Sequence, residues 1–77
     1  MSNLERKFNF YIKGIKNNIP NASKDCMDVL REMNYTPGYK LGEMQPTVSR
    51  SINRYCKATG ESYESVVMKM SMPKLNR

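Results

Sequence analysis

Apolar side chains recur at intervals of three and four positions along most of the chain, which is the spacing of one face of an α-helix. No segment shows the alternation of apolar and polar residues that a half-buried β-strand requires. Prolines, glycines and asparagines divide the chain into about five short segments. The sequence therefore predicts an all-α fold, a small helical bundle of four to five short helices, in a single domain spanning residues 1–77.

Two predicted helices occupy the first half of the chain. The first spans about residues 3–17, and Gly14 within it weakens the helix by up to about 1 kcal/mol relative to alanine. The second begins after an N-cap at Asn21 or Ser23, both good capping residues, and ends near Met33. Both helices are amphipathic, so each is expected to bury one face.

The second half of the chain contains a short and a long predicted helix, followed by a final one. Residues 37–44 form the least regular of these segments because they contain two glycines. Residues 62–70 form the last helix, and residues 71–77 form a basic tail that we expect to be frayed. The most regular predicted helix covers residues 46–59 and ends at Gly60, the residue type favoured just after a helix C-terminus.

The helix at residues 46–59 separates into an apolar side and a cationic side. Arg50, Asn53, Arg54 and Lys57 follow one another at helical spacing, with no acidic residue between the first and the last. The opposite side carries Val48, Ile52, Tyr55, Cys56 and Thr59. Such a helix is suited either to a DNA groove or simply to solvent, and both interpretations stay open on the pattern alone.

Charge favours the first interpretation. The chain has 13 lysines and arginines against seven acids, a net charge of +6, and small basic domains commonly bind nucleic acid or another acidic surface. Arginine can donate two hydrogen bonds to guanine, asparagine can pair with adenine, and lysine can neutralise phosphate. The predicted DNA-binding residues are therefore those at the start and along the cationic side of this helix: Gln45, Thr47, Ser49, Arg50, Asn53, Arg54 and Lys57.

Two stretches resemble known DNA-binding proteins. The run from Thr47 to Ile52 reads TVSRSI and resembles the opening of recognition helices in many bacterial helix-turn-helix regulators. Pro20 and Lys24, with Tyr35 and Pro37 further on, resemble the C-terminal DNA-binding domain of the master sporulation response regulator of Firmicutes. The family has Gly-Tyr directly after the lysine, whereas this chain has Asp-Cys. The resemblance implies an all-helical module with a helix-turn-helix, and nothing about sporulation.

Several classes of function are disfavoured by what the sequence lacks. There is no histidine and only two cysteines occur, Cys26 and Cys56, so we predict neither an enzyme nor a metal site nor a cofactor. Both cysteines are expected to be free and mainly buried, with a single disulfide as the alternative. No apolar run approaches the roughly 20 residues of a membrane span, and the first residues do not resemble a signal peptide. We therefore expect a cytoplasmic protein with no membrane association.

The predicted function is that of a small sequence-specific transcriptional regulator that reads double-stranded DNA with residues 46–59. The alternative is a small phage or mobile-element adaptor or inhibitor that binds a host protein through a basic or methionine-rich face. A homodimer on paired half-sites is an open alternative to a monomer, because one short recognition helix gives limited affinity. Lys13 and Lys16 stay open between phosphate contact and a solubility role. Most tyrosines are expected in the core: Tyr11, Tyr35, Tyr55 and Tyr63.

Overall fold

The computed structural model describes residues 3–36 and 45–71, and within these ranges every regular element is an α-helix. The helices are α1 (Asn3–Lys16), α2 (Ala22–Tyr35), α4 (Gln45–Thr59) and α5 (Tyr63–Ser71). The predicted all-α fold is therefore confirmed. The short helix expected at residues 37–44 lies outside the described residues. Of the frayed tail expected at residues 71–77, Ser71 is instead the last residue of α5, and the rest lies outside the described residues. A helix-turn-helix ending in α4 accordingly stays a prediction.

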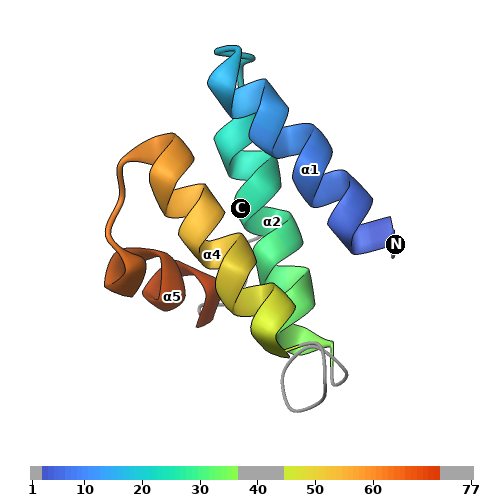
Figure 1. Ribbon diagram of the computed structural model, residues 1–77, viewed down its shortest axis with the longest axis vertical. Coiled ribbons are helices and arrows are strands. Elements are labelled where there is room, and N and C mark those ends of the chain that lie inside the picture. Colours follow the sequence, from blue (N-terminus) through green and yellow to red (C-terminus); the bar gives the residue numbers. More distant parts are fainter. Residues whose placement is uncertain (1–2, 37–44, 72–77) are drawn as a thin grey trace, which may run out of the picture.

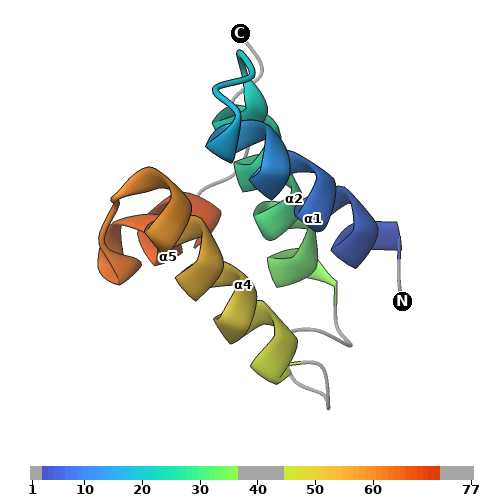
Figure 2. The same ribbon diagram turned by 45° about the horizontal axis from the view of Figure 1, so that its top comes forward.

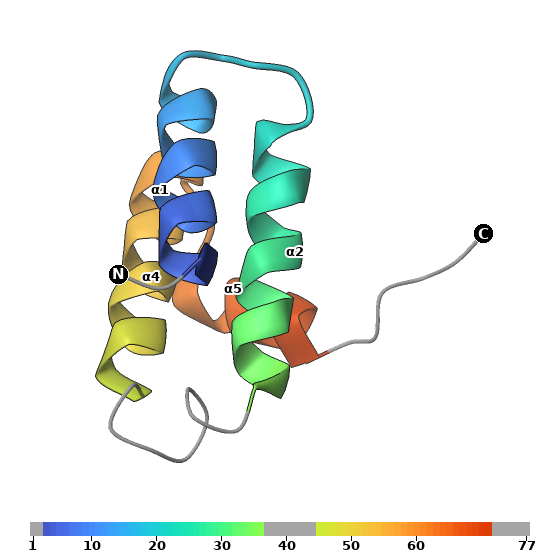
Figure 3. The ribbon, with the colours of Figure 1, turned by 90° about the vertical axis from the view of Figure 1, so that its right-hand side faces the viewer.

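The helices form a bundle in which α2 is the central element. α1 and α2 are antiparallel neighbours, and α4 runs in the same direction as α1 and packs on both of them (Figures 1 and 3). α5 contacts α2 and α4 and lies on the far side of α4 from α1 (Figure 2). One face of α4 is consequently covered by three helices, which leaves its other face for solvent.

The turn between α1 and α2 explains the positions of two asparagines and one glycine. Asn18 and Asn21 adopt positive φ angles of 59° and 68°, a region that asparagine tolerates better than most residues. Gly14 lies where the two helices approach closely, because a Cβ atom placed there would be 3.0 Å from the Cβ of Ala22. Asn21 is the residue before α2, as predicted, but its side chain makes no capping hydrogen bond.

The core draws on all four described helices, and α2 contributes the largest share of it. Leu30, Met33 and Cys26 of α2 have no exposed surface, so this helix is enclosed by its neighbours. Ser51 is the buried polar residue on α4, with 5% of its surface exposed. The remaining members of the core are Phe8, Ile12, Met27, Val29, Ile52, Tyr55, Val66 and Met70.

The end of α4 follows the sequence prediction. Gly60 has a φ of 81° and its amide donates a hydrogen bond of 2.8 Å to the carbonyl oxygen of Cys56. The positive φ favours glycine at this position because it has no Cβ atom. The helix therefore ends at Thr59, and the chain turns directly into α5.

The expectation that most tyrosines lie in the core is wrong for two of them. Tyr35 and Tyr63 are 57% and 43% exposed. Each is at the end of a helix, where its hydroxyl can reach a polar group: that of Tyr35 donates to the carbonyl oxygen of Ser71 over 3.3 Å. The core instead combines aliphatic, methionine and cysteine side chains with the rings of Phe8 and Tyr55.

Candidate nucleic-acid interface

Buried residues of α4 set which of its faces points outward. Ile52 and Tyr55 are buried, and the Tyr55 hydroxyl lies 3.5 Å from the carbonyl oxygen of Ser23 and 3.4 Å from a carboxylate oxygen of Glu61. Burial, followed by the neighbouring Glu61 carboxylate, raises the pKa of Tyr55 to about 12. Tyr55 is therefore a neutral hydrogen-bond donor at neutral pH, and its contacts resist rotation of α4 about its axis.

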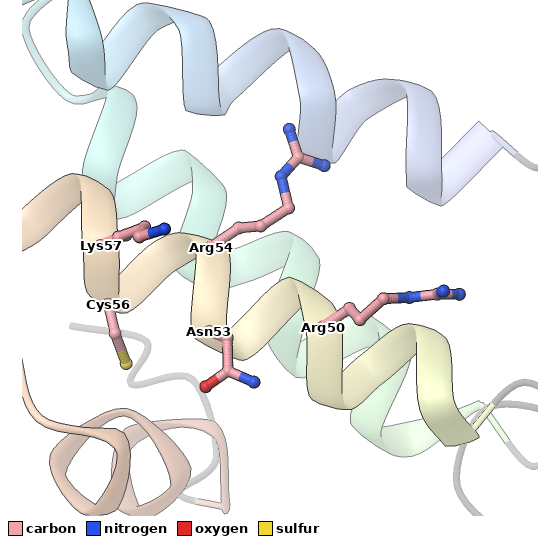
Figure 4. Close-up of a pocket in the computed structure, with 5 residues that line it drawn as sticks. All are labelled: Arg50, Asn53, Arg54, Cys56 and Lys57. Atoms are coloured by element: carbon pink, nitrogen blue, oxygen red, sulfur yellow. The ribbon is translucent and has the colours of Figure 1, made fainter.

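The opposite face of α4 carries the predicted cationic residues, and the structure brings them together. Arg50, Asn53, Arg54 and Lys57 are all exposed. With Cys56 they line an open hollow of 590 Å³ (Figure 4). Arg50, Asn53 and Lys57 make no hydrogen bond or ion pair with other residues that the structure describes. Three polar side chains on this face are therefore available to a ligand.

Arg54 differs from the other three because it is held by α1. Its Nη1 atom donates a hydrogen bond of 2.6 Å to Oδ1 of Asn9, and its guanidinium lies 5.3 Å from the centre of the Phe8 ring. Figure 4 shows the side chain turned toward α1, whereas Asn53 points the other way. A guanidinium over an aromatic face is attracted by the ring quadrupole. Arg54 thus joins α4 to α1, a role that the sequence analysis did not foresee.

The residues predicted at the start of α4 are placed differently from one another. Thr47 and Ser49 are half-buried, and the Ser49 hydroxyl lies 3.4 Å from that of Tyr63 on α5. Ser49 therefore already has a partner within the chain. Gln45 is the first residue of α4, and its side chain lies outside the part that the structure describes.

Lys16 of α1 joins this surface although it was not among the predicted site residues. With Arg54 and Lys57 it lines a second, partly enclosed hollow of 180 Å³ between α1 and α4. Lys13, one turn earlier, lines a hollow on the other flank of α1 beside Phe10 and Gly14. The sequence pattern of α1 could not separate the two lysines, because only the packing of α4 distinguishes them.

The surface formed by α1 and α4 is strongly basic. α4 contains three cations and no acidic residue, and α1 contains four cations and one acid. Arg31 pairs with Asp28 and Lys69 pairs with Glu61, and these residues belong to α2, α5 and the segment before α5. The cations of these two helices therefore outnumber their acidic residue by seven to one.

The two cysteines are free thiols, as predicted. Burial raises the pKa of the Cys26 thiol to about 12, and the nearby Arg54 guanidinium partly opposes this rise. Cys56 is partly buried, and burial raises its thiol pKa as well. A raised pKa leaves a thiol protonated and poorly nucleophilic at neutral pH. Among the described residues no three side chains of the metal-binding types cluster.

No protein-family model, curated protein or solved structure matches this chain. The resemblance to helix-turn-helix regulators therefore rests on the residues quoted for it. Within residues 3–36 and 45–71 no helix is both long and apolar enough to cross a bilayer.

Proposed function

We propose that this protein is a small DNA-binding transcriptional regulator whose α4 enters the major groove of duplex DNA. The observation that carries the proposal is the exposure of Arg50, Asn53 and Lys57 on one face of a helix without acidic residues. An α-helix with its side chains is about 10–12 Å across, which matches a major groove of about 12 Å. Although α1, α2 and α5 all contact α4, the side chains of Arg50, Asn53 and Lys57 stay exposed, so this face is accessible.

Each residue of the face has a distinct proposed role. Arg50 lies in the first half of the described helix and Asn53 directly after its midpoint, and recognition helices contact bases mainly from their N-terminal part. Arginine suits guanine and asparagine suits adenine, because each can make two hydrogen bonds to one base. Lys57 lies further along and would neutralise a phosphate. Arg54 would act as a positioning residue, since Asn9 already accepts one of its hydrogen bonds.

The proposal is tested by titrating fluorescent duplex DNA of mixed sequence with the protein at about 50 mM and about 200 mM salt. The parent protein should bind, and its affinity should fall steeply with salt because counterions are released from DNA. A triple variant, Arg50→Ala with Asn53→Ala and Lys57→Ala, should bind at least about tenfold more weakly, since one good base contact alone is worth about 1–3 kcal/mol.

The matched control removes two exposed cations of α2 and α5 that line neither hollow of α4, Lys24→Ala with Lys69→Ala. It loses as much charge as the triple variant but should keep most of the affinity. Circular dichroism should first show that both variants retain the helix content of the parent. The proposal fails if the parent binds no duplex at the lower salt, or if the triple variant and the control bind equally well.

A second candidate function, binding of a host protein by a small adaptor or inhibitor, is favoured by an apolar surface at the turn between α1 and α2. Phe10 and Ile19 are 71% and 56% exposed, and they line a hollow of 470 Å³ with Tyr11 and Pro20. Large exposed apolar side chains that gather in one place are typical of protein interfaces. The fitting partner is a protein segment that inserts an apolar side chain into this hollow.

The methionine-rich face predicted for this alternative is not assembled among the described residues. Met27, Met33 and Met70 are buried, and Met68 is exposed on α5. Met44 and Met72 lie outside the described residues. The discriminating variant is Phe10→Asp with Ile19→Asp, which should abolish capture of a host protein and leave duplex binding unchanged.

A further inference from the structure

The hollow between α1 and α4 is lined by three cations that come from two helices. Lys16 lies in the last turn of α1 and Lys57 in the last turn of α4, and Arg54 lies one turn before Lys57. Ile12 and Ala58 supply the apolar part of the lining. No acidic residue lines this hollow, so its charge is uniformly positive.

A purely structural reason accounts for only part of this arrangement. Lysines near a helix C-terminus are stabilised by the negative end of the helix dipole, which is equivalent to roughly half an elementary charge. Because α1 and α4 run in the same direction, the negative C-terminal ends of both helices lie at the same end of the bundle (Figure 3). Together they offset about one of the three positive charges. About two charges are left, and Arg54, held by Asn9 and Phe8, cannot turn away without breaking its contacts.

We infer that this hollow binds a phosphate group, and that the group is a backbone phosphodiester of the DNA strand beside the groove that α4 enters. The inference rests on the proposed function and adds a second contacting element, α1, to it. Lys16 and Lys57 would bracket the phosphate oxygens as two ammonium donors. The guanidinium of Arg54 would supply the third positive charge from its anchored position.

Continuity with the surface of α4 favours a nucleic-acid phosphate over free phosphate. Arg54 and Lys57 line both the phosphate hollow and the larger hollow that contains Arg50 and Asn53. A strand that passes along α4 can therefore place a phosphate between the two lysines while its neighbours stay near Arg50. A free oligophosphate would engage the same cations, so the experiment needs an arm for each source.

The decisive comparison is Lys16→Gln against Lys13→Gln. The two variants lose the same charge from the same helix, one turn apart, and only Lys16 lines the phosphate hollow. In duplex titrations at several salt concentrations, Lys16→Gln should lower the affinity about fivefold or more and reduce the slope of log K against log salt by about 0.9. Lys13→Gln should change the affinity less than about twofold.

A second arm uses inorganic tripolyphosphate at constant ionic strength and follows the thermal midpoint of the protein. Duplex binding that weakens with Lys16→Gln and not with Lys13→Gln supports the inference. Equal behaviour of the two variants overturns it and leaves the proposed function standing, because the parent still binds DNA. A Lys16-dependent response to tripolyphosphate without one to duplex overturns the DNA assignment. A parent that binds no duplex overturns both proposals.

Discussion

Charged side chains are arranged differently on the α1–α4 side and on the α2–α5 side of the bundle. On the α2–α5 side, Arg31 pairs with Asp28 at 3.0 Å and donates from Nε to the carbonyl oxygen of Lys69 at 3.1 Å. The ammonium group of Lys69 in turn pairs with Glu61. On the α1–α4 side, cations of two helices face one another, and the hydrogen bond between helices goes from Arg54 to a neutral amide.

This difference indicates which charged side chains stabilise the folded protein and which do not. Neutralised charges on the α2–α5 side link the end of α2 to α5 and can be explained by folding alone. Like charges gathered between α1 and α4 repel one another, and partly enclosed sites are screened less by salt than fully exposed ones. An arrangement that opposes stability is expected at functional surfaces, which supports the proposal that this side binds an anionic partner.

The largest expected effect tests whether the two sides share one core. Leu30 has no exposed surface and belongs to α2, which contacts the other three described helices and supplies the largest share of the core. Leu30→Ala should lower the free energy of unfolding by about 2–5 kcal/mol, because it leaves a cavity at the centre. Urea unfolding followed by circular dichroism measures the loss. Met68→Ala, on the exposed surface of α5, should stay within about 0.5 kcal/mol of the parent. A loss below about 1 kcal/mol for Leu30→Ala would contradict the described core.

The next effect sharpens the distinction within the cationic surface itself. Arg54→Ala removes the hydrogen bond to Asn9 and the contact with the Phe8 ring, and should cost about 1–2 kcal/mol of stability. Arg50→Ala removes the same charge from the same helix but no such contact, so it should cost less than about 0.5 kcal/mol. Thermal or urea unfolding of the two variants provides the comparison. Equal losses would show that Arg54 does not hold α4 against α1.

A smaller effect concerns pH and the thiol beneath the cationic surface. Burial raises the pKa of Cys26 to about 12 in the folded protein, so the unfolded chain loses this proton at lower pH than the folded one. The contribution of the protonated Cys26 thiol to the free energy of unfolding is fully present below about pH 9. It is lost as the pH rises toward the pKa of Cys26 in the folded protein. By about pH 10 the loss should be about 1 kcal/mol.

Tyr55 acts in the same direction as Cys26, because its pKa is also raised to about 12. Unfolding experiments at pH values from about 7 to about 10 should therefore show falling stability. Cys26→Ala, compared with its own stability at neutral pH, should show a shallower decline. A variant that declines as steeply as the parent would exclude Cys26 as a source of the effect.

The smallest effect compares one lysine from each side. Lys69→Gln removes the ion pair with Glu61 and should lower stability by about 0.2–0.5 kcal/mol. Lys57→Gln relieves repulsion near Lys16 and Arg54 and should leave stability unchanged or raise it by a few tenths of a kcal/mol. Both differences should disappear near 1 M salt, where the Debye length is about 3 Å. A Lys57→Gln variant that is less stable than Lys69→Gln would contradict the contrast between the two sides.

Helix positions and the exposed face of α4 could be predicted from the sequence because they depend on neighbouring residues. The spacing of apolar residues set the faces, and Gly60 marked the end of α4 through its backbone freedom alone. The same local information placed Arg50, Asn53 and Lys57 on one surface. The local sequence pattern did not predict the end of α2 correctly. This helix extends to Tyr35, two residues beyond the predicted limit near Met33.

By itself, the sequence determined that the chain is helical, which faces of its helices are apolar, and that its cations gather on α4 and α1. Only the tertiary structure decided that Arg54 is bound to Asn9, 45 positions earlier, and that Lys16 rather than Lys13 meets Lys57. The physical reason is that a helix face follows from a repeat of three to four residues. A contact between helices depends on how the whole bundle packs.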